Sequence, residues 1–362
     1  MERGYSRFVT HLITLIPGDG IGPEVAEAAR FVVDASGVEV EWDLQEAGQA
    51  VMEGEGTPLP ERVLRAIESS RTALKGPITT PVGTGFRSVN VALRQELDLF
   101  AAVRPAITLP GIATRHPQVD IVVIRENTED LYAGIEFEQG SEQAGLLRRK
   151  VLDLSGFELA QDAGVTVKPI SVSGTQRIVR FAFDFARRNR RRSITLGHKA
   201  NIMRFSDGVF LYTAGIEAEF YRDVWFDECQ VDELALRLVT EPEALDVLLL
   251  PNLYGDILSD LCAGLVGGLG LASGANLGWE YAVFEPVHGS APDIAGRGLA
   301  NPIAMILSAA MMLDHVGEPV AAANVRRAVR AVLTAGEVLT RDLGGTASTG
   351  QMAAAIAAAI GG

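Results

Sequence analysis

Apolar runs of strand length alternate with amphipathic stretches along most of the chain. Residues 121–124 and 246–250 are short and mainly apolar, as buried strands are, whereas residues 175–188 carry apolar positions at the helical spacing. This alternation predicts an α/β protein with a mainly parallel sheet, because parallel strands need a crossover between them. The other predicted strands are residues 12–16, 38–44 and 193–197, and the other predicted helices are residues 23–36, 61–69, 207–220, 231–239, 257–265, 303–313 and 321–335.

One segment, residues 134–166, departs from the alternation of strands and helices. It is rich in Gly, Glu and Gln and contains only short alternating pieces. A segment of this kind does not build the core of an α/β domain. We therefore predict that it forms an arm or hairpin that reaches a partner chain.

The composition is that of an ordinary globular protein. The chain has 362 residues, enough for two domains, with 48% hydrophobic and 22% charged residues. No apolar run is long enough to cross a bilayer, and the N-terminal residues lack the apolar core of a secretory signal. We expect a cytoplasmic protein without a membrane partner. Cys229 and Cys262 lie in apolar or amphipathic segments and are predicted to be buried free thiols.

The formal net charge of −14 argues against a nucleic-acid partner. The basic run at residues 187–192 follows a predicted amphipathic helix and precedes a predicted strand, so we interpret it as a solvated helix end. An acidic protein that binds an anion must supply positive potential locally. Arg94, Arg104 and Arg125, together with a divalent metal ion, are the candidates for that role.

Residues 75–94 combine a Gly/Pro/Thr loop with the entry of a helix. Helix starts offer free N–H groups and the positive end of the helix dipole. Ser88, Asn90 and Arg94 add a hydroxyl, an amide and a guanidinium at this point. The combination suits a small substrate that is rich in carboxylates.

Residues 15–24 place glycines between a predicted strand and a predicted helix, as a dinucleotide-binding turn does. The third glycine of that fingerprint is missing at its place, because Pro23 starts the helix and Glu24 occupies the next step. No acidic residue closes a second strand about 20 residues further on, where a Rossmann fold holds the ribose. We therefore favour a tight strand-to-helix turn near a ligand over a Rossmann site.

Two arginines and a tyrosine lie at strand edges further along the chain. Arg104 and Arg125 occupy positions similar to that of Arg94, and three such arginines indicate a substrate with more than one carboxylate. Tyr132 follows Arg125 closely enough to set a phenolic acid beside a carboxylate clamp. The alternative for Tyr132 is simple packing at a strand exit.

Asp256 and Asp260 are one helical turn apart, which stacks both carboxylates on one face of a predicted helix. Asp232, on an earlier predicted helix, offers a third carboxylate, and a set of oxygen ligands suits Mg²⁺ or Mn²⁺. Alternatively, the two aspartates only interact with the positive end of the helix dipole.

Lys199 follows a predicted strand, is one of four lysines and has apolar neighbours. A lysine beside a metal and other cations can serve as a base, the alternative being a surface lysine.

Residues 285–296 form an irregular sequence with the pair Asn301-Pro302 beyond it. His288 supplies an imidazole, Ser290 a hydroxyl and Asp293 a carboxylate, between flexible glycines. The sequence suits an adenine-nucleotide clamp that is built without a Rossmann turn.

Together these motifs resemble the β-decarboxylating dehydrogenase family, which includes isocitrate, isopropylmalate, homoisocitrate and tartrate dehydrogenases. The resemblance covers nearly the whole chain. Ser88-x-Asn90-x-x-x-Arg94 looks like the isocitrate pattern, since isopropylmalate enzymes carry apolar residues there. The resemblance implies that Ser88 and Asn90 contact the γ-carboxylate, while Arg94, Arg104 and Arg125 hold the other two carboxylates.

The same resemblance implies active sites that are shared between two chains of a homodimer or a higher homo-oligomer. Tyr132 would protonate the enolate after CO₂ leaves, and Lys199 of the second subunit would assist deprotonation of the hydroxyl. Asp256 and Asp260, with Asp232 of the second subunit, would hold Mg²⁺ or Mn²⁺ as a Lewis acid.

The cofactor that the resemblance implies is NAD. NADP-preferring isocitrate enzymes carry a lysine and a tyrosine where this chain has Asp293 and Ile294. A carboxylate there accepts hydrogen bonds from ribose hydroxyls and repels a 2′-phosphate. The cofactor-binding residues implied by the resemblance are Thr80, His288, Gly289, Ser290, Ala291, Asp293, Ile294 and Asn301.

The fold implied is the non-Rossmann, two-domain α/β type of this family. Residues 1–103 and 253–362 would form a large domain, and residues 104–252 a small domain that carries the dimer arm. The expected reaction is the NAD-dependent, metal-assisted oxidative decarboxylation of isocitrate to 2-oxoglutarate and CO₂. Homoisocitrate and isopropylmalate dehydrogenases are alternatives, as is a non-catalytic regulatory subunit, which the loss of Tyr132, Lys199 or a metal aspartate would signal. All of these residues are present.

Overall fold

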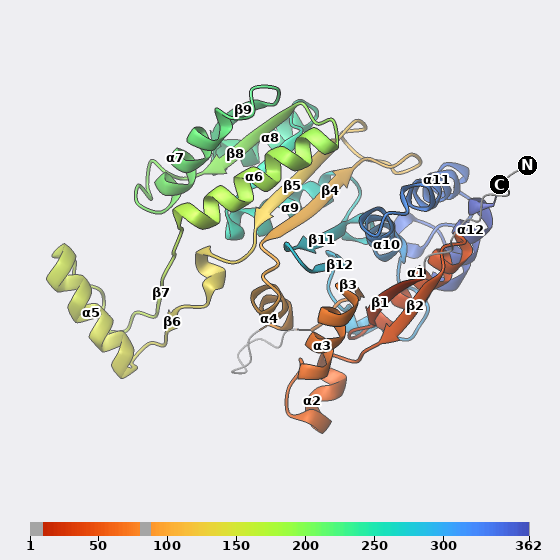
Figure 1. Ribbon diagram of the computed structural model, residues 1–362, viewed down its shortest axis with the longest axis horizontal. Helices are drawn as coiled ribbons and strands as arrows, with labels where there is room; N and C mark the ends of the chain where they lie inside the picture. Colours follow the sequence, from red (N-terminus) through yellow and green to blue (C-terminus); the bar gives the residue numbers. More distant parts are fainter. Residues whose placement is uncertain (1–9, 80–87, 362) are drawn as a thin grey trace, which may run out of the picture.

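Ten strands form one mixed sheet through the computed structural model, which describes residues 10–79 and 88–361 (Figure 1). The strand order is β2-β1-β3-β12-β11-β4-β5-β10-β8-β9. β11 is antiparallel to β12 and β4, and β4 is antiparallel to β5, while the other neighbours are parallel. This mixed, mostly parallel sheet confirms the predicted fold class.

Strands and helices alternate along most of the chain. The strands of the large sheet are β1 (His11–Ile16), β2 (Val40–Leu44), β3 (Thr72–Lys75), β4 (Ala101–Ile107), β5 (Asp120–Glu126), β8 (Ser193–His198), β9 (Trp225–Gln230), β10 (Val247–Leu250), β11 (Ser273–Leu277) and β12 (Ala282–Pro286). The helices are α1 (Gly22–Ala35), α2 (Gln49–Glu55), α3 (Glu61–Ser70), α4 (Val89–Glu96), α5 (Glu142–Ser155), α6 (Val172–Arg188), α7 (Asp207–Ala218), α8 (Val231–Thr240), α9 (Asn252–Leu265), α10 (Ile303–His315), α11 (Pro319–Ala335) and α12 (Thr349–Ile360).

Apolar sequence runs supply the interior strands. β10 lies between β5 and β8 and all of its residues are buried, which explains why its sequence is continuously apolar rather than alternating. α6 packs on these strands through residues at the helical spacing, among them Ile178, Ala182 and Ala186. Its basic C-terminal end is exposed, as predicted, and Cys229 and Cys262 are buried and free.

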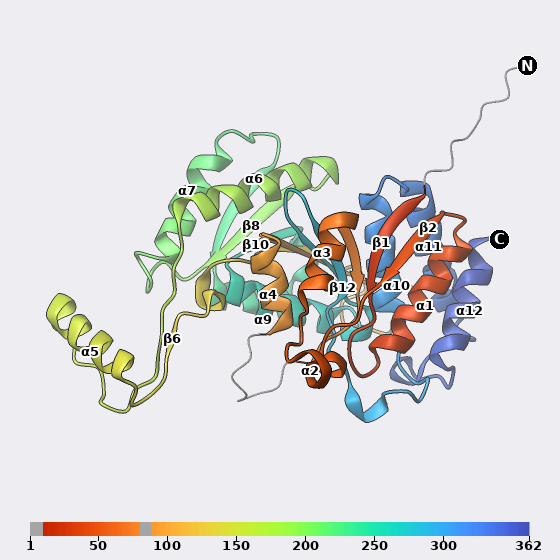
Figure 2. The ribbon, with the colours of Figure 1, turned by 60° about the horizontal axis from the view of Figure 1, so that its bottom comes forward.

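The helices gather at two ends of the sheet (Figures 1 and 2). α1, α10, α11 and α12 pack together around the β1–β3 end, while α6, α7, α8 and α9 surround the β8–β10 end. Between β5 and α6 the chain leaves the body as a ribbon of two short strands, β6 (Glu136–Phe137) and β7 (Val165–Thr166), with α5 at its far end (Figure 1). The predicted arm therefore exists as a projecting segment. Among the residues described, no helix is both long and apolar enough to cross a membrane.

Two departures from the predicted elements affect the site. The helix predicted at residues 257–265 begins already at Asn252, which brings the whole Asn252–Asp260 motif onto α9. β4 has no clear strand pattern, because Arg104 and Pro105 interrupt its apolar run. Pro105 is tolerated because β11 pairs with β4 only from Ala101 to Val103, so that Pro105 lies where β4 has a single partner strand.

Candidate active site

Arg104 and Arg125 reach the same side of the sheet from neighbouring antiparallel strands. Arg125 of β5 pairs with Ala102 of β4, which lies two residues before Arg104. Because side chains of a strand alternate between the two faces, Arg104 and Arg125 share one face. Asn276 of β11 also pairs with Ala102 and therefore belongs to this face. Three neighbouring strands, β11, β4 and β5, thus present two arginines and the Asn276 amide on one face of the sheet.

Both arginines converge on Asp256 of α9. The Arg125 Nη1 donates to Asp256 Oδ1, and the Arg104 Nη1 lies 3.4 Å from the same oxygen and 3.8 Å from Asp260 Oδ1. The Tyr132 hydroxyl, in the short helix η1 (Asp130–Ala133), donates to the other oxygen of Asp256. The structure therefore brings together the predicted tyrosine, two of the predicted arginines and two of the predicted metal aspartates.

Tight packing holds Arg125 in this position. Its side chain is fully buried, and its guanidinium lies 4.8 Å from the centre of the Tyr132 ring. Asn252 accepts hydrogen bonds from Arg125 Nε at 2.9 Å and from Nη2 at 2.7 Å. A Cβ on Gly255 would lie 2.5 Å from Arg125 Cγ, so this turn of α9 can approach β5 only with glycine there.

The electrostatics of the cluster follow from burial and from the arginine charges. Burial favours protonation of Asp256, but the charge of Arg125, the Tyr132 hydroxyl and the charge of Arg104 outweigh it and lower the pKa. Burial raises the pKa of Asp260 against the opposing effect of Arg104. Burial and the hydrogen bond to Asp256 raise the pKa of Tyr132, so the phenol keeps its proton at neutral pH and can act as an acid.

A cavity of about 120 Å³ adjoins this cluster, on the side of the ion pair between Lys75 and Glu285. Lys75 Nζ lies 2.5 Å from Glu285 Oε2, and Arg94 Nη2 lies 3.6 Å from Oε1. Burial raises the pKa of Glu285, but the charges of Lys75 and Arg94 outweigh it and hold the pKa at about 2.

Three buried polar atoms of the cavity lining, Asn90 Oδ1, Arg94 Nε and His288 Nε2, have no partner within the described residues. Buried polar atoms in native proteins are normally satisfied, so these atoms point to a polar ligand. Ser88 directly precedes α4, which carries Asn90 and Arg94.

The predicted cofactor loop packs on the first strand-to-helix turn. Ile21 N donates to Ser290 O at 2.8 Å, and the Ser290 hydroxyl lies 2.7 Å from that of Thr79. A Cβ on Gly20 would lie 2.0 Å from Ser290 O. The glycines of this turn therefore serve close backbone packing, which agrees with the interpretation against a Rossmann site.

The remaining residues of the loop differ in their accessibility. Asp293 is exposed in the short helix η4 (Pro292–Ile294), beside the half-buried Ile294, and Gly289 lines the small cavity. Ala291 precedes η4 with a φ of 38°. Asn301 is tied into the fold, since its Nδ2 donates to Asp342 Oδ2 at 2.9 Å. Thr80, also predicted to bind the cofactor, lies outside the described residues.

Lys199 and Asp232 lie apart from this cluster. The Lys199 ammonium donates to Asp232 and lies 3.2 Å from Gln230 Oε1, and the hydrogen bond from Lys199 lowers the pKa of Asp232. In residues 10–79 and 88–361 no group of three or more His, Cys, Asp or Glu side chains is placed to hold a metal ion. One chain therefore does not bring Asp232 to Asp256 and Asp260, and the assignment of Asp232 and Lys199 to a partner's site stays a prediction.

Sequence reasoning missed several residues that support the site. Asn252 and Ser259 hold Arg125 and Arg104, with Ser259 Oγ 2.6 Å from Arg104 Nη1. Their helical spacing from Asp256 could have indicated them. The Lys75–Glu285 pair joins β3 to β12, and the sequence gives no sign of that contact beyond the rarity of lysine in this chain.

The fold and the site define an α/β protein with a cluster of arginines on one face of a mixed sheet, and its first strand-to-helix turn serves backbone packing. A family model described as isocitrate/isopropylmalate dehydrogenase matches residues 12–356. The chain belongs to the isocitrate/isopropylmalate dehydrogenase family.

Relatives in this family match over nearly their full length. The chain is 42% identical over 359 residues to a probable isocitrate dehydrogenase [NAD] subunit alpha, mitochondrial, of Drosophila melanogaster, covering 99% of this chain and 90% of the relative. It is 42% identical over 350 residues to the isocitrate dehydrogenase [NAD] subunit alpha of Homo sapiens, covering 96% and 89%. The crystal structure of isocitrate dehydrogenase from Methylococcus capsulatus is similar with a TM-score of 0.89 and 50% identity, covering 97% of this chain and 99% of that one.

Proposed function

We propose that this chain catalyses the oxidation and decarboxylation of isocitrate by NAD, giving 2-oxoglutarate, CO₂ and NADH. The observation that carries the proposal is the convergence of Arg104, Arg125 and Tyr132 on one carboxylate beside the cavity lined by Arg94 and Asn90. Relatives named as NAD-dependent isocitrate dehydrogenases align with nearly the whole chain. A panel of isocitrate, homoisocitrate and isopropylmalate, each with NAD or NADP and with Mg²⁺ or Mn²⁺, tests it. Isocitrate with NAD is expected to give the highest kcat/KM.

The substrate contacts that we propose use the charges of the cluster. Arg94, Arg104 and Arg125 bind two carboxylates, and Ser88 and Asn90 bind the γ-carboxylate. The Asn90 side chain supports this assignment, because it lines the small cavity, where its amide NH₂ group can donate to an anion. An apolar isopropyl group in this position would leave that amide unsatisfied.

The acid–base groups that we propose are Tyr132 and Lys199. Tyr132 delivers a proton to the enolate carbon after CO₂ has left, which its raised pKa supports. Lys199 of a second subunit assists removal of the hydroxyl proton. Asp256 and Asp260 offer carboxylate oxygens on one face of α9, and with a partner's Asp232 they fit Mg²⁺ or Mn²⁺. A metal ion bound there would polarise the hydroxyl oxygen as a Lewis acid.

NAD is the proposed cofactor, held by Thr80 and by the loop from His288 to Asn301. Asp293 is exposed, and within the described part of the chain its carboxylate makes no ion pair. It is therefore available to accept hydrogen bonds from the adenosine ribose. The exposed position of Asp293 next to Ile294 makes the pair accessible to a cofactor without rearrangement of the core.

A homo-oligomer is the proposed assembly. Tyr212, Ile216 and Phe220 lie one turn apart along α7 and its end and are exposed, as is Ile257 of α9. An apolar stripe of this kind marks a protein interface. We also propose that residues 1–103 and 253–362 act as a large domain and residues 104–252 as a small one with its arm. Light scattering on the purified protein measures the number of chains.

The cytoplasmic location stays a prediction, and the names of the relatives from animals contain the word mitochondrial.

A further inference from the structure

Lys168 lies between two buried aspartates that belong to different elements. Its Nζ is 2.6 Å from Asp207 Oδ1 and 3.5 Å from Asp130 Oδ1. Asp207 begins α7 and Asp130 begins η1, and both aspartates are buried. Lys168 itself comes two residues after β7, where the arm returns to the body of the protein. One ammonium group therefore joins three segments that are far apart in the sequence.

Asp130 holds the segment that carries Tyr132. Its φ of 66° is in the left-handed region, which aspartate tolerates better than most residues. Its Oδ2 accepts a hydrogen bond from Leu253 N, in the first turn of α9, at 2.9 Å, and its own N–H donates to Pro169 O at 2.9 Å. Its Oδ1 has no hydrogen-bond partner among the described residues and faces the Lys168 ammonium. Because Tyr132 is only two residues further along η1, Asp130 fixes the segment that aims the phenol.

Asp207 holds the turn that carries Lys199. Its Oδ2 accepts a hydrogen bond from the backbone N–H of Lys199 at 2.7 Å, while its Oδ1 accepts the one from Lys168 at 2.6 Å. The turn is closed by Met203 N, which donates to Lys199 O at 2.9 Å. The backbone of Lys199 is thus fixed through Asp207 at the point where β8 ends.

The charges of this bridge make it sensitive to the loss of the lysine. Two buried carboxylates within reach of one ammonium are both attracted to it, and without it they repel each other at low dielectric. The Lys168 ammonium also lies 4.7 Å from the centre of the Tyr254 ring, which adds a cation–π contact. A neutral side chain at position 168 would therefore drive the two carboxylates apart, together with the segments that they hold.

We propose that Lys168 is a positioning residue that fixes the segments of both proposed acid–base groups, Tyr132 and Lys199. The inference rests on the proposed function, in which Tyr132 of one chain works with Lys199 of its partner. The two groups of one chain then serve different active sites. Lys168 therefore links the two active sites of a dimer through the interior of each chain.

Kinetics and hydrogen exchange on the full-length protein test this bridge. Lys168→Met is expected to lower kcat for isocitrate by about 10–100-fold with the KM within about threefold, because the displaced groups transfer protons rather than bind substrate. Lys168→Arg restores the charge and should recover part of the lost kcat. Hydrogen exchange in residues 130–133 and 199–203 should be faster in Lys168→Met. Asp207→Asn keeps the shape of its side chain, loses one charge of the bridge and should show the same separation of kcat from KM, even if Lys168→Met does not fold.

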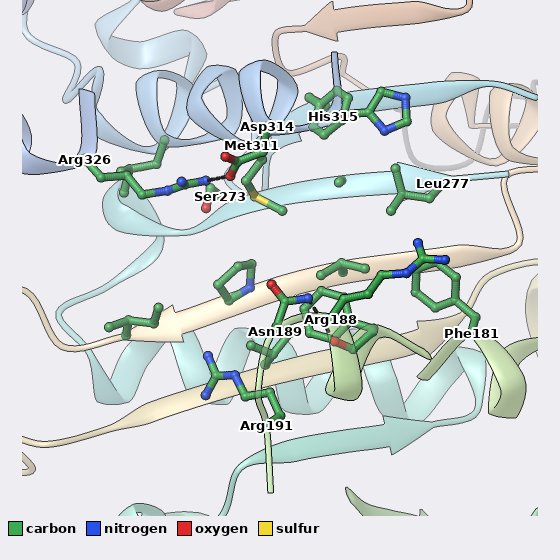
Figure 3. A pocket seen from close by; sticks show the side chains of 18 of the residues that line it. Phe181, Arg188, Asn189, Arg191, Ser273, Leu277, Met311, Asp314, His315 and Arg326 are labelled. Carbon is green, nitrogen blue, oxygen red and sulfur yellow. Dashed lines mark hydrogen bonds and ion pairs between the residues drawn. The ribbon is translucent and has the colours of Figure 1, made fainter. Parts of the chain in front are cut away.

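Arg191 provides a matched control, because it is also a largely buried cation between two carboxylates. Its guanidinium is 2.7 Å from Asp120 Oδ1 and 3.0 Å from Asp246 Oδ1, and its side chain is 16% exposed against 13% for Lys168. Asp120 begins β5, whereas Arg125 of the substrate cluster lies near the end of that strand. Arg191 instead lines a separate cavity of about 670 Å³ (Figure 3). Arg191→Met should therefore retain the wild-type kcat and the wild-type exchange in both segments.

A mixed dimer separates the two halves of the proposal. A Tyr132→Phe chain paired with a Lys199→Met chain keeps one intact site, which takes Tyr132 from the second chain and Lys199 from the first. Lys168→Met added to either chain should lower the activity of this mixed dimer. A loss of activity with only one of the two placements would overturn the claim that Lys168 holds both segments.

The remaining outcomes also decide. Wild-type kcat in Lys168→Met, wild-type exchange in either segment, or an equal loss of kcat in Arg191→Met would each overturn the proposal. A mixed dimer that is inactive with Lys168 intact would overturn the link between two sites. A protein that turns over none of isocitrate, homoisocitrate and isopropylmalate would instead overturn the proposed function, and hydrogen exchange would then decide by itself whether Lys168 holds the two segments.

Discussion

Tyr132 donates a hydrogen bond to the oxygen of Asp256 that Arg125 leaves free. The tyrosine and the arginine thus address opposite oxygens of one carboxylate, from η1 and from β5. We expect a substrate carboxylate that enters between them to compete with Asp256 for Arg125 and to free the phenol for the substrate. Under the proposed function, Tyr132 would be a partner of Asp256 before substrate binds and a proton donor afterwards.

Removal of the phenol should therefore lower turnover more than affinity. Tyr132→Phe is expected to lower kcat by about 10²–10⁴-fold, the usual contribution of a general acid, with a smaller change in the KM for isocitrate. Steady-state kinetics with NAD and Mg²⁺ measure both constants. Tyr221→Phe, on a tyrosine stacked on Phe183 away from the site, is the control and should retain wild-type kinetics. Wild-type kcat in Tyr132→Phe would remove Tyr132 from the mechanism.

Substrate choice should depend on the amide of Asn90. Asn90→Leu is expected to lower kcat/KM for isocitrate by about 5–150-fold, because a lost hydrogen bond to a charged group costs about 1–3 kcal/mol. The same change should improve the ratio of isopropylmalate to isocitrate turnover. A purified variant assayed with both substrates decides the matter, and an unchanged ratio would show that Asn90 does not contact the γ-substituent.

Cofactor choice should depend on Asp293 and Ile294. The double variant with Lys at 293 and Tyr at 294 is expected to lose about 10–150-fold in kcat/KM for NAD relative to NADP, because the ribose loses a charge-assisted partner and the 2′-phosphate gains one. Both residues lie in a short surface helix, so the fold should be unaffected. An unchanged NAD to NADP ratio would mean that another segment reads the ribose.

Stability at acid pH should depend on Glu285. Its pKa of about 2 in the folded protein lies below its ordinary value of 4.5, so the unfolded chain takes up a proton that the native state resists. The stabilisation is present above about pH 4.5 and is lost as the pH falls toward 2, a loss on the order of 3 kcal/mol. Urea unfolding of the wild-type protein from pH 6 to pH 3 should show this decline, and Glu285→Gln should show a shallower one. Parallel curves would indicate that Glu285 titrates normally.

Active sites shared between chains predict complementation. Lys199→Met and Tyr132→Phe should each inactivate a homodimer, because each removes one acid–base group from both sites. Subunit exchange between the two variants should restore activity, since a mixed dimer contains one site with both groups intact. Heterodimers isolated with two affinity tags but without activity would place Lys199 and Tyr132 in the site of a single chain.

Local patterns in the sequence predicted the elements, while contacts between distant segments remained hidden. The helical spacing of Asp256 and Asp260 was sufficient to place both on one helix face, whereas their common site with Arg125 was implied by the family resemblance. The antiparallel insertion of β11 was not predictable, because Ser273–Leu277 has little apolar periodicity and owes its place to pairing with β4 and β12. The Lys75–Glu285 contact depends on that arrangement, since it links strands more than two hundred residues apart in the chain.

Gly255 carries no functional group, yet the approach of α9 to Arg125 requires it. Even a methyl group there would meet the base of a buried arginine side chain, which has no room to retreat. A mutational scan of this protein should therefore find one of its least tolerant positions at a residue that takes no part in proton transfer, metal binding or substrate contact. Searches for active-site residues by chemical function alone would pass over it.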